Sequence, residues 1–525
     1  ISYDMYFTRG EYYQLSHEYK KALKDFQQVP LTGNPKVRKR QMECERGLKL
    51  MKKPIKVKVE NLGSTINSNS NEVLPKITAD DKELYFSSYR EGATGGMRFP
   101  MDIYYTRKKM DESWGAVVQL EQPINSIYNE ACVGISADGH TMFLYRGDNG
   151  GDLFVTHFRG GQWQEPESFL FNTKAKESSM TISPNGQDLL FIRKEKGQTS
   201  EMYSCELRKD STWSLPEIFE LNTPYDEETP FFHADGNTLF YSSKGNGSIG
   251  GFDVMYATKT ATGWSMPKNV GFPLNTAKDE LGFVLCANGR KGYYSSMRRE
   301  GFGEQDIYQM NFEDDLFKTQ MVLVSGVITD NFADFLEADI RIINLVSGEL
   351  VTHAFSNQLN GEYLLALENG REYGIRIEKS GYFFHSEYIF IPAESGYEEN
   401  RYDVVLFEKR IGKKVVLKNV FFELGKSDLD QKSEGELLKL VEFMEGNKDI
   451  RIQIGGHTDD VGNEESNIAL SEQRAESVKL FMIEKNVLAS RVEIKGYGSS
   501  KPVADNKKKE GRRMNRRIEF ELLEE

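Results

Sequence analysis

The spacing of apolar residues changes twice along the chain, and each of the three patterns predicts a different kind of structure. In residues 1–53, apolar and aromatic positions recur every three or four residues, as they do in amphipathic helices. From residue 54 to 408, short alternating runs are separated by turns rich in Asp, Asn and Gly, which predicts β-strands. From residue 409 to the end, strand and helix patterns alternate in the order βαβαββ, which predicts a mixed sheet with helices on one side. We therefore expect a multidomain, mainly β protein.

Residues 1–53 predict a small helical segment, in which Gly10 stands where two antiparallel helices would turn. A further helix, KVRKRQMECERGLKLMKK, follows a break between Pro30 and Pro35. The stretch YFTRGEYYQLSHEYKKAL resembles one tetratricopeptide unit. Because a single unit cannot bury its apolar face alone, we expect it to pack on a neighbouring domain, on further N-terminal residues or on a partner.

Residues 54–320 contain a repeat of about 50 residues. A strand and a tight turn recur as ITADDKELYFSS, ISADGHTMFLYR, ISPNGQDLLFIR, FHADGNTLFYSS and VLCANGRKGYYSS, with the turns at Asp81, Gly139, Gly186, Gly236 and Gly289. An acidic residue opens a later strand in each repeat: Asp102, Asp152, Glu201, Asp253 and Asp306. The protein's four tryptophans, Trp114, Trp163, Trp213 and Trp264, follow the first four of these acids by 11 or 12 residues. One acid and one tryptophan per repeat is what turn closure and packing between repeats require, so we interpret both as structural.

A period near 50 residues with several strands per unit is typical of a β-propeller. The repeats resemble the WD40-like repeats of TolB-type propellers. Residues 54–63, PIKVKVENLG, resemble the segment that follows Trp in the other repeats, so we expect this strand to complete the last blade. Five blades are predicted, with six as the alternative, and a ligand in the propeller channel is left open.

Residues 321–408 predict a small β-sandwich of short strands separated by Asp, Asn and Gly turns. The segment resembles the carboxypeptidase regulatory-like domain, a seven-stranded, Ig-like module without chemistry of its own. The predicted domains are therefore 1–53, 54–320, 321–408 and 409–525.

The last domain carries the motif GGHTDDVGNEESNIALSEQRAESV, preceded by FFELGKSDL and followed by GYGSSKPVADNKKKEGRRMNRRIEFEL. These three motifs resemble the peptidoglycan-binding C-terminal domain of the OmpA family, which also occurs in Pal lipoproteins and flagellar motor stators. The resemblance spans the whole domain and implies that it binds the peptide stem of peptidoglycan.

Asp459 and Arg474 have the chemistry that such a ligand needs. Asp459 follows a predicted strand and Arg474 lies about two turns into the next helix, so both side chains can border one cleft. A carboxylate accepts hydrogen bonds from an ammonium group, while a guanidinium offers a planar fork to a carboxylate. Diaminopimelate presents both groups on one carbon. A lysine stem lacks that carboxylate and would leave Arg474 unpaired.

By resemblance, Asp459 and Arg474 match the principal ligand residues of the family, and Asn467 matches its supporting asparagine. Further contact positions fall at or near Phe422, Glu423, Val461 and Arg517. Glu423 stands where many members have Asp, and Val461 where many have Thr, so two contacts differ from the family pattern.

Composition narrows the remaining classes of function. The chain has 525 residues and a net charge of −13, which argues against nucleic-acid binding. The charge is +6 over residues 1–53, −18 over 54–410 and −1 over 411–525, so the basic run from Lys507 to Arg517 is local. We interpret this run either as an attraction for anionic wall polymer or as a solvated loop. No stretch approaches the roughly 20 apolar residues of a membrane-spanning helix.

The motifs of catalysis and metal binding are missing from the sequence. The four cysteines lie far apart without a CxxC pair, and the histidines occur singly, so we predict no metal site and no cofactor. There is no GxSxG, HExxH or phosphate-binding glycine loop, and we predict that the protein is not an enzyme. His457 is interpreted as a structural loop residue.

Together these patterns predict a noncatalytic scaffold in the periplasm, associated with the outer membrane and peptidoglycan. The order of the four domains resembles that of a protein family of the Bacteroidota type IX secretion system, with paralogues in gliding and adhesin export. That resemblance implies outer-membrane or periplasmic protein partners, with a PorP/SprF-like membrane protein as a candidate, bound through the helical segment or the propeller. A lipoprotein anchor ahead of Ile1 is compatible with this scheme. The alternatives are a wall hydrolase that uses the propeller, or a propeller that binds a soluble glycan or peptide.

Overall fold

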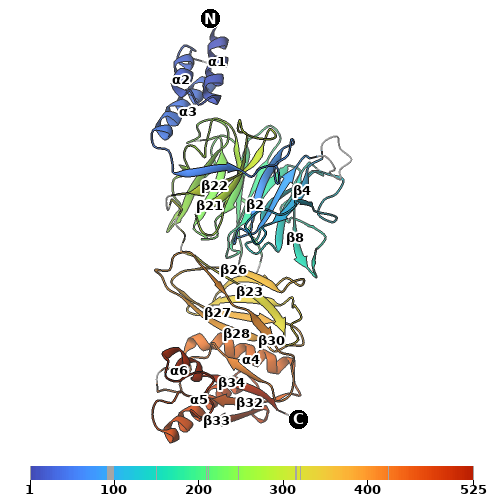
Figure 1. Ribbon diagram of the computed structural model, residues 1–525, viewed down its shortest axis with the longest axis vertical. Coiled ribbons are helices and arrows are strands. Elements are labelled where there is room, and N and C mark those ends of the chain that lie inside the picture. The colour runs from blue at the N-terminus through green and yellow to red at the C-terminus, as the bar shows by residue number, and fades with distance from the viewer. Residues whose placement is uncertain are drawn as a thin grey trace. The chain divides into compact units, whose positions relative to one another are not determined.

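The computed structural model describes residues 2–523 except 33, 91–99, 149, 209, 211, 246, 314, 315, 318, 320 and 424. Ile1, where the first predicted domain begins, and Leu424 of the FFELGKSDL motif lie outside the described residues. The protein is mainly β, as predicted, and is organised in many separate sheets (Figure 1). No helix in the described residues is long and apolar enough to cross a membrane.

Two compact units make up the chain. The first comprises Ile1–Ser325, Leu364–Glu368 and Glu394–Arg401, and the second comprises Gly326–Tyr363, Asn369–Ala393 and Tyr402–Glu525.

The first unit begins with three helices, α1 (Tyr3–Leu15), α2 (Tyr19–Phe26) and α3 (Pro35–Lys52). Helix α1 starts where the Ser2 hydroxyl accepts a hydrogen bond from the Met5 N–H, and α3 starts at a proline, whose missing N–H costs nothing at that position. Buried Tyr19 and Phe26 pack in one core with α1 and α3.

The predicted role of Gly10 is wrong. It lies inside α1, and the chain turns only after Leu15, with His17 in the left-handed region at φ 60°. A Cβ on Gly10 would lie 2.7 Å from the Phe26 ring, so this glycine allows α1 and α2 to approach closely rather than to turn.

The helical segment buries its apolar face on the loop between strands β16 and β17. Ile249 of that loop is fully buried in the helical core. The Gln14 amide donates to the Ile249 carbonyl oxygen at 3.1 Å and to Glu43 at 2.9 Å. The face expected to need a neighbour therefore contacts Ser248 and Ile249 of the neighbouring sheets.

Five successive sheets follow the helices. The first contains β2 (Glu72–Ile77), β3 (Glu83–Ser88), β4 (Asp102–Arg107) and β5 (Val118–Gln119). The second contains β6 (Glu130–Ile135), β7 (Thr141–Arg146), β8 (Asp152–Arg159), β9 (Gln162–Trp163) and β10 (Glu167–Ser168). The third contains β11 (Lys176–Ile182), β12 (Asp188–Lys194), β13 (Ser200–Glu206) and β14 (Glu217–Ile218). The fourth contains β15 (Glu227–Phe232), β16 (Thr238–Ser243), β17 (Asp253–Thr260), β18 (Gly263–Trp264) and β19 (Lys268–Asn269).

The fifth sheet joins distant parts of the chain. Its strands are β20 (Glu280–Leu285), β21 (Lys291–Ser296) and β22 (Asp306–Phe312), and its outer strand is β1 (Val57–Asn61), which pairs antiparallel with β22. Strand β1 lies within residues 54–63, where a strand completing the last repeat was expected.

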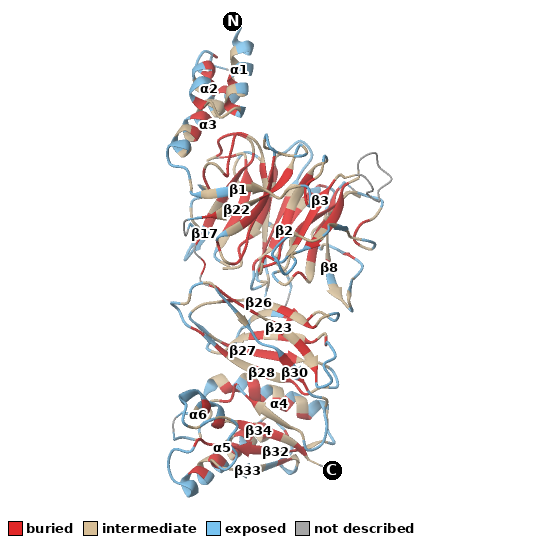
Figure 2. Ribbon diagram, viewed as in Figure 1, coloured by how far each residue is buried: buried red, intermediate tan, exposed pale blue. Residues whose placement is uncertain are grey.

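Neighbouring sheets bury each other's faces in a closed order. Tyr85 of the first sheet shares a core cluster with Cys132 of the second, and similar clusters join the second to the third and the third to the fourth. The rings of Phe240 and Phe283 lie 4.8 Å apart between the fourth and fifth sheets. Tyr293 of the fifth sheet then packs with residues of the first. Figure 2 shows the buried strands of these sheets.

The turn positions, and four of the five acids, behave as predicted. Asp81, Gly139, Gly186, Gly236 and Gly289 all have φ between 61° and 77° in the turn that joins the first two long strands of each sheet. Asp102, Asp152, Asp253 and Asp306 open a strand, and Glu201 is the second residue of β13.

A second repeated motif was not recognised in the sequence. It consists of Asn, then Ser or Thr, and then Glu four residues after the Ser or Thr. In each sheet the Asn side chain bonds to both the N–H and the carbonyl of one residue on a neighbouring strand; these asparagines are Asn67, Asn125, Asn172, Asn222 and Asn275. The Ser or Thr hydroxyl donates to the Glu carboxylate, and the five glutamates, Glu72, Glu130, Glu177, Glu227 and Glu280, are fully buried. These buried acids therefore stabilise the loops between successive sheets.

Two further sheets follow. One has the order β25-β24-β27-β28, and the other has β23 paired with β26, β29 and β30. The strands are β23 (Met321–Asp330), β24 (Asp339–Asn344), β25 (Leu350–Phe355), β26 (Glu362–Glu368), β27 (Arg371–Glu378), β28 (His385–Ile391), β29 (Glu398–Arg401) and β30 (Val404–Leu406). Eight strands are described where seven were expected, because β29 and β30 pair one after the other, both in parallel, with β23.

The C-terminal domain has the sheet order β31-β34-β32-β33, with β32 and β33 parallel. Its elements are β31 (Lys414–Leu417), α4 (Glu434–Gly446), β32 (Arg451–Gly456), α5 (Glu464–Glu484), β33 (Val492–Gly496), α6 (Lys509–Asn515) and β34 (Ile518–Leu523). The basic run, for which a solvated loop was one of two interpretations, partly forms α6.

Helices α4 and α5 cover one face of this sheet, as predicted. Leu440 and Val478 pack with Ile454 and Phe520 in a single core. Phe383 and Phe384, from the turn between β27 and β28, belong to the same core, so the C-terminal domain and the preceding sheet share buried apolar contacts.

Candidate functional site

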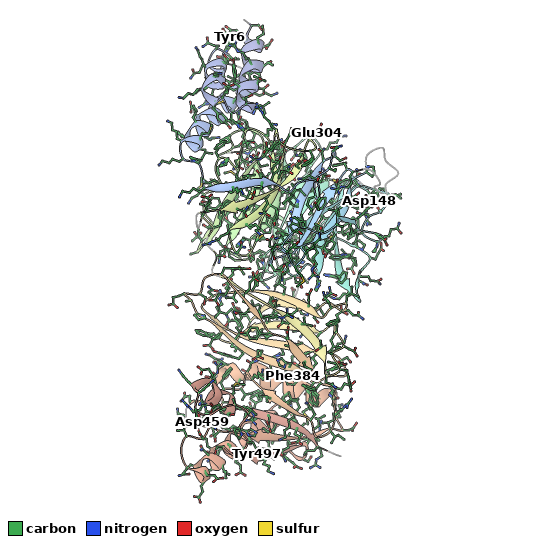
Figure 3. All side chains as sticks on the ribbon, in the orientation of Figure 1. Tyr6, Asp148, Glu304, Phe384, Asp459 and Tyr497 are labelled. Carbon is green, nitrogen blue, oxygen red and sulfur yellow. The ribbon has the colours of Figure 1, made fainter. Side chains whose placement is uncertain are left out.

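Asp459 lies in the loop between β32 and α5 and is 8% exposed (Figure 3). Its Oδ1 accepts a hydrogen bond from the Val461 N–H at 3.1 Å. Its Oδ2 accepts one from Arg516 Nη1 at 2.5 Å. The carboxylate is therefore held in a fixed orientation by the backbone of its own loop and by a residue at the end of α6.

Arg474 is held by backbone carbonyl groups of the segment that precedes α4. It lies on α5, is 5% exposed, and donates from Nε to the Lys426 carbonyl at 2.9 Å and from Nη2 to the Glu423 carbonyl at 3.4 Å. Its guanidinium carbon lies 5.0 Å from the centroid of the Phe422 ring. Within the described residues Nη1 has no hydrogen-bond partner, so one edge of the guanidinium remains available to a ligand.

The charge of Arg474 is affected by its surroundings in three ways. Burial lowers its pKa most, and the nearby positive charge of Arg516 lowers it further, while the negative charge of Asp459 raises it. Asp459 supplies one negative charge near two arginines, of which Arg516 contacts it, so a carboxylate ligand would compensate the remaining positive charge.

Asn467 fixes the loop that carries Asp459. It is 7% exposed on α5, and its Nδ2 donates to the carbonyl oxygens of Asp459 at 3.4 Å and Val461 at 3.2 Å. The loop is thereby tied to the same helix as Arg474. The Val461 side chain is 65% exposed beside it.

The structure places the other predicted residues in different surroundings. Phe422 lies against Arg474, whereas the Glu423 carboxylate is exposed and pairs with Lys426, so Glu423 contributes its carbonyl group to the site. Arg517 is directed to Glu519, at 3.2 Å, and to the Lys501 carbonyl.

Arg516, adjacent to the predicted Arg517, is the arginine that contacts Asp459. Sequence reasoning had placed it only within a basic run. The sequence carries no signal that separates the two, because Arg516 and Arg517 are adjacent and both precede β34.

His457 has a structural position, as interpreted from the sequence. It is 1% exposed, stacks on Tyr497 with ring centroids 4.9 Å apart, and pairs with Glu519 at 3.1 Å. Burial would raise the pKa of Glu519, but hydrogen bonds from His457 and Lys414 lower it to about 2. This charged cluster supports β34 next to Arg516.

No group of three His, Cys, Asp or Glu side chains in the described part of the chain is arranged to hold a metal ion. The acids of the five sheets are used internally. Asp253, for example, accepts a hydrogen bond from the Ile249 N–H, and Asp306 accepts from the Phe302 and Gly303 N–H groups.

Comparison with known proteins identifies the domain that carries the site. The OmpA family model matches residues 421–516. Outer membrane porin F of Pseudomonas fluorescens is 39% identical over 101 residues, which are 19% of this chain and 31% of the porin. The peptidoglycan-associated lipoprotein of Buchnera aphidicola is 31% identical over 123 residues, which are 23% of this chain and 68% of the lipoprotein.

Among solved structures, the crystal structure of the peptidoglycan-associated lipoprotein from Burkholderia pseudomallei matches with 26% identity and a TM-score of 0.19, over 20% of this chain and 87% of that one. The chain spans less than a third of the length of porin F.

These relatives are outer-membrane proteins and a peptidoglycan-associated lipoprotein. The protein is accordingly placed in the periplasm, in association with the outer membrane and peptidoglycan, as predicted. Through its C-terminal domain, the chain belongs to the OmpA family.

Proposed function

We propose that the C-terminal domain binds the diaminopimelate-bearing peptide stem of peptidoglycan. The observation that carries the proposal is the arrangement of Asp459 and Arg474, both buried and both held by backbone groups. Asp459 would accept the ammonium group of the ligand, while Arg474 Nη1 would donate to its carboxylate. Asn467 would hold the Asp459 loop against α5, which carries Arg474. Phe422, Val461 and Arg516 would line the site, and Arg517 would support it through Glu519.

We further propose that the five sheets form a five-bladed propeller, that the helices form a tetratricopeptide-like unit, and that the two following sheets form a regulatory-like sandwich. The whole chain would then act as a noncatalytic scaffold that tethers an outer-membrane assembly to the wall. Type IX secretion, gliding and adhesin export are the processes that the domain order suggests. The core clusters that join the five sheets in a closed order, and the burial of their acids, support the propeller.

The binding proposal is tested with purified sacculi. Full-length protein should sediment with sacculi that contain diaminopimelate, and Asp459→Ala or Arg474→Ala should lose most of this retention. Asp460→Ala and Arg451→Ala are matched controls, because Asp460 is the exposed neighbour of Asp459 and Arg451 is a partly exposed arginine paired with Glu493. Equal retention of all five proteins would contradict the proposed site.

A further inference from the structure

The segment from Lys501 to Arg517 has a charge opposite to that of the rest of the C-terminal domain. It carries eight Lys and Arg side chains against two acids, a net charge of +6, whereas the other residues from 411 to 525 carry −7. The segment contains α6 and ends beside the candidate site, because Arg516 contacts Asp459. A basic surface therefore adjoins the proposed peptide site in an otherwise acidic domain.

Buried polar contacts fix the backbone of this segment. Asn515 is fully buried, and its Oδ1 accepts hydrogen bonds from the N–H groups of Val503 at 2.7 Å and Ala504 at 3.0 Å. Its Nδ2 donates to the Ala504 carbonyl at 2.8 Å, and Arg512 donates to the Asn506 carbonyl, also at 2.8 Å. Side chains on this segment are therefore presented from an ordered backbone.

Three cations of the segment are left without a partner. Five of the eight contact other groups of the second unit: Lys501, Arg512, Arg513, Arg516 and Arg517. The remaining three, Lys507, Lys508 and Lys509, are exposed and form no ion pair within the described residues. We call these three residues the lysine triplet. Asp505 and Glu510 offset part of its charge.

Helix stability does not account for the lysine triplet. Lys508 is the N-cap of α6 and makes no side-chain capping bond, and Lys509 is the first residue of the helix. Ser, Thr, Asp and Asn cap the start of a helix best, and cations at this end are opposed by the helix dipole. An anionic ligand that contacts the three ammonium groups would offset this cost.

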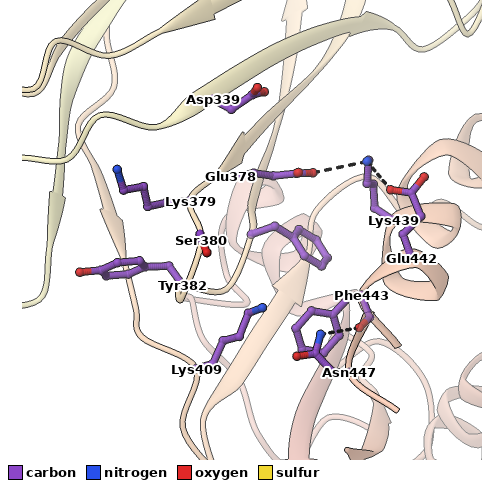
Figure 4. Close-up of a pocket in the computed structure, with 11 residues that line it drawn as sticks. Asp339, Glu378, Lys379, Ser380, Tyr382, Lys409, Lys439, Glu442, Phe443 and Asn447 are labelled. Carbon is purple, nitrogen blue, oxygen red and sulfur yellow. Dashed lines mark hydrogen bonds and ion pairs between the residues drawn. The ribbon is translucent and has the colours of Figure 1, made fainter. Parts of the chain in front are cut away.

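A cleft elsewhere in the second unit shows the opposite arrangement. It has a volume of about 420 Å³ and is lined by three lysines and three carboxylates, from the end of β27, α4 and nearby residues. There, Lys439 lies between Glu378, at 3.7 Å, and Glu442 (Figure 4). The cleft therefore offers a ligand no net charge, whereas the lysine triplet does.

We propose that the lysine triplet is a second, electrostatic contact with peptidoglycan, which binds stem carboxylates other than those of diaminopimelate. The proposal rests on the proposed peptide binding at Asp459 and Arg474. In the stem, a glutamate linked through its γ-carboxyl precedes diaminopimelate and keeps a free α-carboxylate. Helix α6, which joins the triplet to Arg516, has seven residues and is about 10 Å long, a distance that about three extended residues can cover.

The test uses the full chain and two soluble muropeptides that differ only at the glutamate α-carboxyl, which is free in one and amidated in the other. Calorimetry at an ionic strength of about 0.1 M should show about fivefold tighter binding of the free form. This preference should vanish at about 1 M, where the Debye length is only about 3 Å.

The variant Lys507→Gln/Lys508→Gln/Lys509→Gln should bind both muropeptides with equal affinity, close to that of the unaltered protein for the amidated form. The matched control is Lys448→Gln/Lys479→Gln/Lys495→Gln, which removes the same charge from the same domain outside the basic segment and should keep the preference. Equal binding of both muropeptides by the unaltered protein, or an equal loss of preference in the control, would overturn the proposal.

Two further measurements separate this contact from a membrane contact and from the peptide site. If sedimentation with phosphatidylglycerol vesicles required the lysine triplet while the muropeptide preference did not, the triplet would bind a membrane and the proposal would be wrong. Asp459→Ala should weaken binding of both muropeptides by a similar factor. Unchanged binding of the amidated form by Asp459→Ala would contradict the peptide site, whereas the lysine triplet is judged by the preference for the free carboxyl.

Discussion

Arg516 Nη1 and Asp459 Oδ2 lie 2.5 Å apart, so the carboxylate proposed to accept the ligand's ammonium group is already paired with a guanidinium from the end of α6. The Arg516 side chain is 36% exposed and that of Asp459 only 11%. Arg516 therefore orients Asp459 and adds a positive charge beside it.

Replacement of Arg516 by Ala should weaken binding of a diaminopimelate-containing muropeptide by about tenfold, because one charge-assisted contact that positions Asp459 is lost. Arg516→Lys should retain part of the affinity. Calorimetry with the soluble muropeptide measures both. Arg513→Ala is the control, since Arg513 lies over Tyr388 and does not contact Asp459. If Arg516→Ala bound as tightly as the unaltered protein, Arg516 would have no positioning role.

The cluster around Glu519 should make the stability of the C-terminal domain sensitive to acid. Burial opposes ionisation of Glu519, but His457 and Lys414 lower its pKa to about 2. A carboxyl whose folded pKa lies below its unfolded value, near 4.3, stabilises the fold above pH 4.3, and this contribution is lost as the pH falls to 2. The contribution is on the order of 3 kcal/mol.

Urea unfolding of the full chain between pH 2 and pH 6 measures this effect. The Glu519→Gln variant should lose stability at pH 6 and should depend less on pH than the unaltered protein. Glu521→Gln provides the control, because Glu521 is on the same strand and pairs with the same Lys414 at the longer distance of 3.3 Å. Parallel pH profiles for Glu519→Gln and the unaltered protein would rule out this role.

The sequence predicts the repeat but not the way in which its loops are fixed. Turn positions such as Gly236 are visible because only a few residues adopt positive φ easily, and Gly is the first of them. The pairing of Asn275 with both backbone groups of Val254 joins residues 21 apart, and no local pattern of hydrophobicity reveals it. Alignment of the five repeats on Glu280 and its equivalents would have exposed the Asn-Ser/Thr motif.

At the candidate site, the resemblance predicts Asp459, Arg474 and Asn467; the structure places Asn467 and Arg474 on α5 and bonds Asn467 to the Asp459 carbonyl. It did not distinguish Arg516 from Arg517, because two adjacent arginines satisfy the same motif and only the direction of β34 separates them. Nor could it show that Glu423 contributes its backbone carbonyl oxygen rather than its carboxylate. Every residue type has a backbone carbonyl, so a motif of residue types does not reveal such a contact.

Asp81 joins the first and fifth sheets and should be among the most important polar residues of the first unit. Its Oδ2 lies 2.5 Å from Lys108 Nζ and 2.6 Å from Lys291 Nζ, and the Tyr293 hydroxyl donates to Oδ1 at 2.6 Å. Lys108 is itself almost fully buried. Asp81→Ala would leave this ammonium without its main partner, at a cost of about 3–5 kcal/mol in the free energy of unfolding.

Tryptophan fluorescence during urea unfolding reports on this change, because all four tryptophans lie in residues 114–264. Glu112→Ala is the control: this exposed carboxylate pairs with the same Lys108 at 3.7 Å and should contribute less than about 1 kcal/mol. A midpoint for Asp81→Ala no lower than that of Glu112→Ala would show that Asp81 does not link the sheets.

Gly10 should be intolerant of even a methyl group, although alanine is the better helix former. An Ala Cβ at this position would lie 2.7 Å from Phe26 Cε1 and 2.9 Å from Cδ1, so α1 and α2 must separate or the ring must move. The steric cost, about 1–3 kcal/mol, should exceed the gain of up to about 1 kcal/mol in helix propensity. Limited proteolysis between Phe26 and Pro35 measures the loosening, and Gly10→Ala should be cut faster than the unaltered chain. Because the conflict is with the ring, the double variant Gly10→Ala/Phe26→Leu should recover part of the resistance; cleavage of the double variant as fast as of Gly10→Ala would mean that contact with Phe26 is not the cause.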